Sequence, residues 1–417
     1  MTVAQSSSIQ RAPASTPSAL RALSSLAEPA LRRRLSSLRD ARLIVEQEGR
    51  RRVYGDQADT DGLTAVLRIH DRGAWGRVAL RGALGAGEGY ALGEWSSPEP
   101  TAVVQVLLRN RQVLYGLNRG LSRLSAPLTA AMHAARRNTR VGSKRNIAAH
   151  YDLSNDFFEL LLDETMTYSS GIFEDDRTSL AEASRTKLDR LCQLLELGPD
   201  DHLLEIGTGW GSMAMHAARE YGCRVTTTTI SEAQYELAGR RIREAGLSDR
   251  VTLLRSDYRD LRGEYDKLVS VEMIEAVGHQ FFGTYFESCR RLLRPGGQAA
   301  LQAIVIGEAD YARARDTVDF IKAHVFPGCC IPSIAVLLEA ASAGGGFKLD
   351  HLDAFGTHYA RTLAAWRENL TERQGRAREL GLHDPQLRAW DYYLSYCEGG
   401  FRERHIDLVQ MRLSAPR

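Results

Sequence analysis

The sequence predicts an α/β protein with a large, doubly wound, mostly parallel sheet domain and a small α+β domain before it. Two observations support this prediction. After about Ser179, apolar runs of strand length alternate with helical segments, which is the order from which parallel sheets are built. At 417 residues the chain also exceeds one typical domain, so two folding units are expected.

The composition along the chain divides it into four parts. Residues 1–30 are rich in Ser, Ala and Pro and predict a flexible tail with at most one short helix. Residues 31–135 are expected to form the small domain, and the polar, basic segment 136–145 predicts a linker. The remaining residues, 146–417, are expected to form the large domain.

The small domain is expected to begin with strands. Between Ala41 and Trp95 lie three β-like runs, LIVEQEGRRRVYG, VLRIHD and VALRGALGAGEGYALGEW, which Gly and Asp interrupt. From Thr101 to about Arg137, apolar residues recur at helical spacing, which predicts one long helix. Pro127 must kink or end that helix.

The front of the chain is basic and the rest is acidic. Residues 1–150 hold 23 Lys/Arg against 11 Asp/Glu, and the remainder holds 31 against 41, although the whole chain has a formal net charge of only +2. Such asymmetry predicts that the N-terminal surface meets a polyanion, either an anionic membrane or nucleic acid. A solvated, arginine-rich face without a partner is the alternative.

Membrane spans and metal or disulfide sites are not expected. No apolar run reaches the roughly 18 residues that a membrane span needs, and the N-terminus lacks the apolar core of a signal peptide. We therefore expect a cytoplasmic protein, associated peripherally with the inner face of the membrane. The six cysteines are scattered, without a C-x-x-C pair or matching His spacing, so neither a zinc site nor a disulfide framework is expected.

The strongest local motif is LLEIGTGWGSMAMHAA, residues 203–218, which reads as a strand, a glycine turn and a helix. Glycines permit a tight turn and a close approach to a ligand, and a helix N-terminus offers free N–H groups. Glu205, two residues before Gly207, suits an ammonium group, which a dinucleotide lacks. Asp257 follows a later strand, where it can accept from an adenine amino group or, alternatively, cap a helix.

The segment RLLRPGGQAALQ is a helix ended by Pro-Gly-Gly before an expected edge strand. Together with the glycine turn and Asp257, it completes the pattern of a Rossmann-like class I methyltransferase domain. The cofactor expected from this pattern is S-adenosylmethionine.

Five segments distinguish this chain from ordinary small-molecule methyltransferases. They are NIAAHYDLSNDFFELLLDETMTYSSGIF (146–173), DYRDL (257–261), SVEMIEAVG (270–278), FIKAHVFPGCCIPS (320–333) and FGTHYARTLAAW (355–366). Through them the chain resembles the cyclopropane fatty acid synthase family over essentially residues 60–417.

The resemblance implies a lipid-binding N-terminal domain and an acyl-chain-binding insertion in the large domain. It implies that the cis double bond of an unsaturated phospholipid acyl chain attacks the sulfonium methyl group of S-adenosylmethionine. A bound bicarbonate then takes a proton from the carbocation as the ring closes. The resemblance implies no metal and is compatible with a homodimer.

Site residues follow from the resemblance position by position. Those expected to line the cofactor are Tyr168, Ser169, Glu205, Gly207, Gly209, Thr229, Ile230, Gln234, Asp257 and Tyr258. Glu275 and Tyr359 match the family's catalytic carboxylate and phenol, and Ser170, Gln302 and Ile304 belong to its bicarbonate pocket. A carbocation in a hydrocarbon pocket needs a nearby negative charge or aromatic face, which such residues supply.

Two of these positions depart from the family pattern. Ser170 and Gln302 stand where the family has a cysteine and a histidine. Both side chains can still hydrogen-bond bicarbonate, so we expect anion binding to persist and cyclopropanation to be the outcome. The changes leave open a fatty-acyl C-methyltransferase that makes methylene- or methyl-branched chains.

Two other classes of function are disfavoured. A non-catalytic lipid-binding protein would have lost the glycine turn or Glu275, and the chain retains both. An enzyme that methylates nucleic acid would be expected to have an N/D-P-P-[YF]-type motif beside the cofactor, and the sequence lacks one.

Overall fold

The computed structural model describes residues 18–55, 62–117, 138–139, 142 and 154–417. The chain divides into two compact units, which are described separately. The N-terminal unit comprises Met1–Ala135, Asp316–Pro327 and Leu370–His405, and the large unit comprises Arg136–Arg315, Gly328–Asn369 and Ile406–Arg417. The large unit is therefore not the continuous stretch 146–417 that the sequence suggests. Within the described ranges, no helix is long and apolar enough to cross a membrane.

A four-stranded sheet of order β2-β1-β3-β4 forms the framework of the N-terminal unit. β1 (Arg42–Gln47) pairs antiparallel with β2 (Arg50–Tyr54) and parallel with β3 (Thr64–Ile69), and β4 (Trp95–Ser96) pairs antiparallel with β3. The helical elements of this unit are α1 (Ser18–Leu35), α2 (Gly73–Ala91), α3 (Pro100–Arg109), α4 (Arg111–Leu117), the π-helical turn Ile321–Val325, α15 (Gln374–Glu379) and α16 (Asp384–Arg402).

Two helices correct the sequence-based expectations. α1 occupies residues 18–30 of the predicted tail, and α2 replaces the predicted strand VALRGALGAGEGYALGEW. The glycines of α2 serve close packing and do not mark strand ends. A Cβ added at Gly76 would lie 2.5 Å from the carbonyl oxygen of Leu20, and one added at Gly87 would lie 2.5 Å from the ring of Phe320.

The long helix expected between Thr101 and Arg137 is interrupted at Asn110. The backbone of Asn110 has φ −107° and ψ 54°, which is not helical. Its side chain accepts a hydrogen bond from the backbone nitrogen of Arg39 at 2.7 Å and donates one to the Arg39 carbonyl at 2.9 Å. These long-range bonds override the apolar period, which carries no information about them. Residues 118–137, with Pro127, and most of the predicted linker lie outside the described residues.

A seven-stranded sheet of order β10-β11-β9-β8-β5-β6-β7 forms the centre of the large unit. β5 to β9 pair in parallel, and β11 pairs antiparallel with β9 and β10, which confirms the predicted α/β fold. β9 is not the edge strand that was expected, because β11 covers it. The strands are β5 (His202–Ile206), β6 (Arg224–Thr229), β7 (Val251–Arg255), β8 (Tyr265–Val271), β9 (Leu293–Ile306), β10 (Lys348–Ala354) and β11 (Ile406–Ser414).

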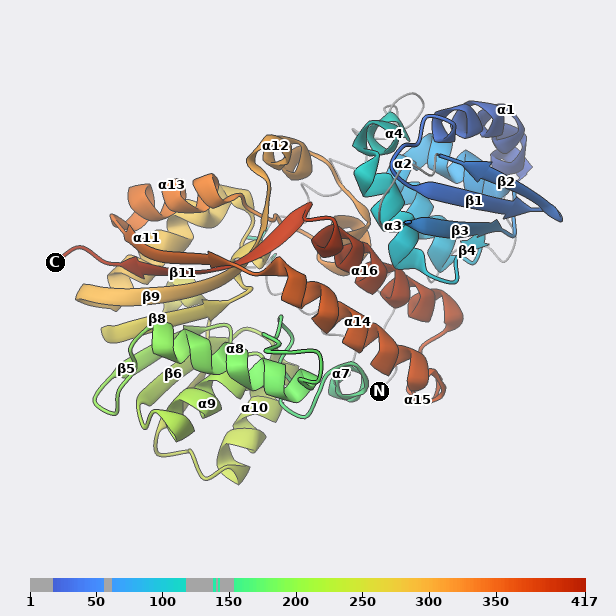
Figure 1. Ribbon diagram of the computed structural model, residues 1–417. Helices are drawn as coiled ribbons and strands as arrows, with labels where there is room; N and C mark the ends of the chain where they lie inside the picture. The colour runs from blue at the N-terminus through green and yellow to red at the C-terminus, as the bar shows by residue number, and fades with distance from the viewer. Residues whose placement is uncertain (1–17, 56–61, 118–137, 140–141, 143–153) are drawn as a thin grey trace. The chain divides into compact units, whose positions relative to one another are not determined.

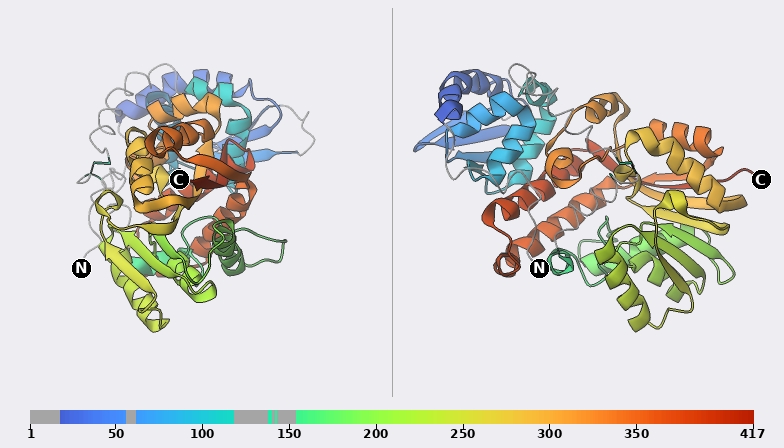
Figure 2. Two further views of the ribbon diagram at one scale, coloured as in Figure 1. Left: turned by 90° about the vertical axis from the view of Figure 1, so that its left-hand side faces the viewer. Right: turned by 180° about the vertical axis from the view of Figure 1, so that it is seen from behind.

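Helices cover both faces of this sheet (Figure 1), and Figure 2 shows the same layers from behind. α8 (Leu180–Leu194), α9 (Ser212–Glu220) and α10 (Glu232–Glu244) cover one face, and α11 (Phe282–Leu292) and α13 (Ile334–Gly345) cover the other. The remaining helices are α7 (Asn155–Leu161), α12 (Glu308–Asp316) and α14 (Gly356–Glu372), and short 3₁₀ turns follow β7 and β8.

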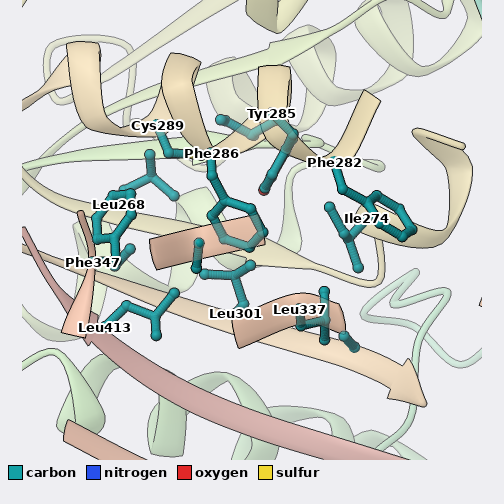
Figure 3. Close-up of a cluster of buried hydrophobic side chains, with 14 of the residues drawn as sticks. Leu268, Ile274, Phe282, Tyr285, Phe286, Cys289, Leu301, Leu337, Phe347 and Leu413 are labelled. Atoms are coloured by element: carbon teal, nitrogen blue, oxygen red, sulfur yellow. The ribbon is translucent and has the colours of Figure 1, made fainter. Parts of the chain in front are cut away.

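The two layers have separate apolar cores because successive side chains of a strand point to opposite faces. Leu203 of β5 packs in the core that holds α8 and α9, whereas Leu204 packs in the core that holds α11 and α13. Figure 3 shows the second core, where Tyr285 and Phe286 of α11 lie near Leu301 of β9. β5, β6 and β8 are parallel neighbours, so their carboxyl ends lie at the same edge of the sheet. Ligands of such sheets bind at that edge.

Candidate active site

The glycine turn after β5 adopts backbone conformations that other residues disfavour. Gly207, Gly209 and Gly211 have φ of 102°, 53° and 91°, a region natural to glycine. A Cβ added at Gly207 would lie 2.8 Å from Cγ of Met273, whereas one added at Gly209 would meet no described atom within 4 Å. The turn therefore presents bare backbone at Gly209, which fits the close approach of a cofactor.

Glu205 is a buried carboxylate directly below this turn. Thr227 of β6 donates a hydrogen bond from Oγ1 to Glu205 Oε2 at 2.5 Å, and Thr208 Oγ1 lies 2.7 Å from Thr227 Oγ1. Burial raises the pKa of Glu205 to about 8, although the Thr227 bond and Lys187 lower it. A bound ammonium group would stabilise the ionised form, which fits the role expected for Glu205.

Lys187 is a site residue that the sequence analysis missed. It lies on α8 and is 1% exposed, and its Nζ donates to Ser169 Oγ at 2.8 Å. Burial lowers the pKa of Lys187 to about 8, although Glu272 and Glu205 raise it. The available signal was its spacing, because Lys187 lies four residues after Ala183 and four before Leu191, both on the buried face of α8.

The ends of β6 and β7 carry other residues expected at the cofactor. Thr229 Oγ1 lies 2.7 Å from Gln234 Oε1 and donates to it, and both side chains are buried. Asp257 caps the 3₁₀ turn that begins at Tyr258 by accepting from the backbone nitrogen of Arg259 at 3.0 Å. Its two oxygens also accept from Arg259 Nε at 2.8 Å and Nη2 at 2.6 Å. Asp257 therefore serves as a cap, the alternative weighed for it, and as an ion-pair partner.

The other expected cofactor residues are buried or half-buried. The ring of Tyr258 is buried in the apolar core, edge-on to Tyr285 at 5.3 Å. Ile230, after β6, is half-buried. Tyr168 is also half-buried and lies between two aromatic neighbours, Trp366 at 5.2 Å and Phe158 at 5.3 Å. This aromatic group supplies an apolar wall with π-faces.

Glu272 is the second site residue that the sequence analysis missed. It follows β8 directly, three residues before Glu275. Its Oε1 accepts from Ser170 N at 3.0 Å and from Gln302 Nε2 at 2.7 Å, and its Oε2 accepts from Tyr359 OH at 2.5 Å. The motif SVEMIEAVG contains two glutamates, and the resemblance drew attention to Glu275 alone.

The backbone at Glu272 is also unusual. Its φ is 50°, a left-handed conformation that is costly for a residue with a Cβ and that clusters at functional sites. Loss of hydration raises the pKa of Glu272, whereas Tyr359, Gln302 and Ser170 lower it through hydrogen bonds. The neighbouring Met273 lies against Gly207, so this carboxylate adjoins the glycine turn.

Glu275 lies in a buried 3₁₀ turn after β8. Its Oε1 accepts from the backbone nitrogen of Ile304 at 2.5 Å, and its carbonyl accepts from Cys330 N at 2.8 Å. Its Oε2 has no hydrogen-bond partner among the described residues. Burial, and then Glu272, raise the pKa of Glu275 to about 8, because two buried carboxylates resist a second negative charge.

The residues expected to hold bicarbonate do not fit it. Ser170 N, Gln302 Nε2 and Tyr359 OH all donate to Glu272, and Ile304 N donates to Glu275. The hydroxyl of Ser170 donates to the Gly171 carbonyl at 2.9 Å, and Gln302 Oε1 accepts from Gln410 at 2.9 Å. The donors are directed at carboxylates of the chain itself, so they are already engaged and do not present a site for a further anion. Nowhere in the described part of the chain do three or more His, Cys, Asp or Glu gather as a metal site.

Comparison with known proteins places this geometry in context. Residues 138–411 match the family model "Mycolic acid cyclopropane synthetase". The chain is 39% identical over 375 residues to a tuberculostearic acid methyltransferase of Mycobacterium tuberculosis, covering 87% of each chain. It is 33% identical over 354 residues to a cyclopropane-fatty-acyl-phospholipid synthase of Escherichia coli, covering 84% of this chain and 88% of the relative.

Solved structures agree with these matches. A cyclopropane synthase from Mycobacterium tuberculosis shares the fold with a TM-score of 0.61 and 30% identity, over 65% of this chain and 98% of that chain. A mycolic acid cyclopropane synthase in complex with SAH and CTAB matches with a TM-score of 0.61 and 31% identity, over the same shares.

Proposed function

Because the chain belongs to the mycolic acid cyclopropane synthetase family of S-adenosylmethionine-dependent methyltransferases, we propose that it alkylates the cis double bond of unsaturated phospholipid acyl chains. The proposed product is a cyclopropane ring. One observation carries the proposal: Glu272 and Glu275 lie together beside the glycine turn, where a developing carbocation needs negative charge.

The residues of the cofactor side have binding roles in this proposal. The cofactor, when bound, supplies an electrophilic methyl group. The bare backbone at Gly209 admits it, and Glu205 holds its ammonium group in the ionised form. Tyr168, with Trp366 and Phe158 packed around it, excludes water and lines the path of the acyl chain. Exclusion of water strengthens the electrostatic effect of the carboxylates.

The carboxylates act on the acyl chain after methyl transfer. The alkene carbon that does not receive the methyl group becomes positive, and a preorganised negative charge lowers the free energy of that state. Removal of one such group typically costs about 10²–10³ in rate. Glu275 is well placed for this electrostatic role, because its Oε1 is fixed by Ile304 N and its Oε2 has no described partner.

A branched product is the second candidate, and two observations favour it. Ser170 and Gln302 bind a chain carboxylate, so proton removal differs from the scheme that the resemblance implies. The chain is also 39% identical to a tuberculostearic acid methyltransferase, against 33% to the cyclopropane-forming relative. A hydride shift before proton loss would turn the same cation into a methylene-branched chain.

We also propose that the N-terminal unit binds anionic bilayers. Residues 50–52 of β2 are arginines with exposed side chains, and the adjoining Val53 is 55% exposed. Basic side chains beside an exposed apolar one suit the headgroup region. The charge excess is smaller than the sequence suggests, because Met1–Ala135 holds 18 Lys/Arg against 11 Asp/Glu, but the two later segments add 7 against 8.

Lipid analysis of an expressing host tests the function. A cyclopropane-deficient bacterium carrying this chain should convert unsaturated phospholipid acyl chains into products with one additional CH₂, and a Glu275→Gln variant should not. Mild catalytic hydrogenation before gas chromatography and mass spectrometry separates the products, because a methylene branch takes up hydrogen and a cyclopropane resists. Unaltered fatty acids in a host with confirmed soluble expression would contradict the proposed function.

A further inference from the structure

We propose that Glu272 is the proton acceptor of this enzyme and that its carboxylate occupies the position of the bicarbonate in the related scheme. This inference rests on the proposed function and extends it. It predicts a reaction that needs no bicarbonate, in contrast to the expectation from the sequence.

The geometry around Glu272 is that of a bound anion. Three donors from separated parts of the chain converge on its two oxygens: Ser170 N at 3.0 Å, Gln302 Nε2 at 2.7 Å and Tyr359 OH at 2.5 Å. A planar anion with two oxygens satisfies these donors, and carboxylate and bicarbonate share that shape. Since the side chain of Glu272 already satisfies them, the site is filled by the protein.

The position of Glu272 also suits contact with a substrate. As a whole residue Glu272 is half-buried, whereas Glu275 is 8% exposed, so Glu272 is the less deeply buried of the two. Its φ of 50° stores strain that a glycine would relieve. A strained backbone that is kept in place by three hydrogen bonds is typical of a group held for function.

A further hydrogen bond fixes the orientation of Gln302, one of the three donors to Glu272. Gln410 Nε2 donates to Gln302 Oε1 at 2.9 Å, which fixes the Gln302 amide so that its Nε2 faces Glu272. The cation of Lys187 favours the ionised form of Glu272. The two carboxylates Glu272 and Glu275 repel each other when both are ionised, which favours a protonated form. An ionised carboxylate with raised proton affinity is what a general base needs.

The alkene π-electrons form the new carbon–carbon bond to the transferred methyl group, and the carbon–sulfur bond breaks with its electrons on sulfur. Glu272 then removes a proton from the new methyl group. The electrons of that carbon–hydrogen bond close the ring onto the cationic carbon. Glu272 becomes a carboxylic acid and returns its proton to water after the product leaves.

The first experiment measures bicarbonate itself. Calorimetric titration of bicarbonate into the S-adenosylhomocysteine complex should show no binding to the wild-type protein. A Glu272→Gly variant leaves the three donors around a carboxylate-sized space and should bind bicarbonate. This readout does not depend on turnover, so it tests the filled site even if the proposed reaction were wrong. Saturable bicarbonate binding to the wild-type protein would overturn the proposal.

The second experiment measures turnover in buffers depleted of carbon dioxide. Wild-type activity should be unchanged when bicarbonate is removed or added. Glu272→Gln should lose about 10²–10⁴-fold in kcat, the usual contribution of a general base. Glu272→Gly should lose as much without bicarbonate and recover at least about tenfold when bicarbonate or formate is added. A bicarbonate requirement in the wild-type enzyme, or a fully active Glu272→Gln, would disprove the role of Glu272.

Matched controls separate this role from a folding effect. Glu196 has φ 52°, lies in the same unit and pairs with Arg412, whose other partners are Asp350 and the carbonyl oxygen of Leu194. Glu196→Gly therefore relieves similar backbone strain without touching the site, and it should keep wild-type activity with no response to bicarbonate. Thermal unfolding and the cofactor Kd of each variant report whether the fold and the cofactor site survive. An inactive wild-type enzyme with normal cofactor binding would count against the proposed function alone.

Discussion

Thr227 donates a hydrogen bond to Glu205 across neighbouring strands, with 2.5 Å between Oγ1 and Oε2. The carboxyl group is buried, and its pKa is raised from 4.5 to about 8, so the cofactor-free protein holds it mostly protonated near pH 7. Binding a cationic ammonium group requires the ionised form and therefore releases a proton below pH 8.

We expect the Kd for S-adenosylmethionine to fall as the pH rises from 6 to 8, by at most about tenfold per pH unit. Isothermal titration calorimetry in two buffers of different ionisation enthalpy measures both the affinity and the released proton. Glu205→Gln should bind more weakly and without proton release. A pH-independent Kd in the wild-type protein would contradict the role of Glu205.

Alanine at Gly207 should reduce stability, whereas alanine at Gly209 should reduce cofactor affinity. Gly207→Ala places a Cβ 2.8 Å from Met273 Cγ at φ 102°, so it should lower the melting temperature. Gly209→Ala meets open space at φ 53°, which costs only about 1–2 kcal/mol, but its methyl group enters the space expected for the cofactor. We expect at least about a tenfold weaker cofactor Kd for Gly209→Ala, measured by calorimetry at a temperature where it is folded. Wild-type affinity in Gly209→Val would place the site elsewhere.

Glu275 should matter for turnover more than for cofactor binding. Glu275→Gln keeps the shape and the hydrogen bond from Ile304 N but removes the carboxyl group's ability to ionise beside the developing cation. We expect kcat to fall about 10²–10³-fold while the cofactor Kd stays within about twofold. Glu287→Gln, an exposed position on α11, is the control. Near-normal turnover in Glu275→Gln would refute the electrostatic role.

Ser170 and Gln302 should influence the product. The double variant Ser170→Cys with Gln302→His replaces an amide that both donates to Glu272 and accepts from Gln410 with an imidazole of different reach. A base displaced by ~1 Å can change a rate about a hundredfold, and about 1.4 kcal/mol changes a product ratio tenfold. We expect a shifted ratio of cyclopropane to branched lipid. If the product profile were unchanged, these positions would not control the outcome.

Residues 50–52 should contribute to membrane binding. Each exposed arginine near an anionic surface adds about 1 kcal/mol, and salt screens the effect. Replacing all three with alanine should weaken co-sedimentation with phosphatidylglycerol vesicles and leave neutral vesicles unaffected. The control replaces three exposed arginines of the large unit, Arg219, Arg224 and Arg240. If vesicle binding did not change with salt, with lipid charge or with the triple substitution, residues 50–52 would not be the membrane-binding surface.

Much of the large unit could be predicted because its signals are local. The strands β5, β7 and β8 carry apolar residues and β6 is rich in β-branched threonine, while α8 and α10 begin at serine caps, such as the capping box of Ser179 and Glu182 on α8. The N-terminal unit was harder to predict. The glycines of α2 look like the glycines that end strands or form turns. Their actual role is steric, because the backbone of α1 and the ring of Phe320 leave no room for a Cβ at Gly76 and Gly87.

The sequence by itself determined the fold class, the glycine turn and the identity of most candidate site residues, because these depend on local patterns and on recognisable motifs. Only the tertiary structure decided what each side chain does. Asp257 binds Arg259, Lys187 turns inward to Ser169, and Glu272 takes the donors expected for bicarbonate. The physical reason is distance along the chain: Ser170, Glu272, Gln302 and Tyr359 meet only because the sheet and α14 bring their segments together, and hydrogen bonds at about 3 Å depend on that folded geometry.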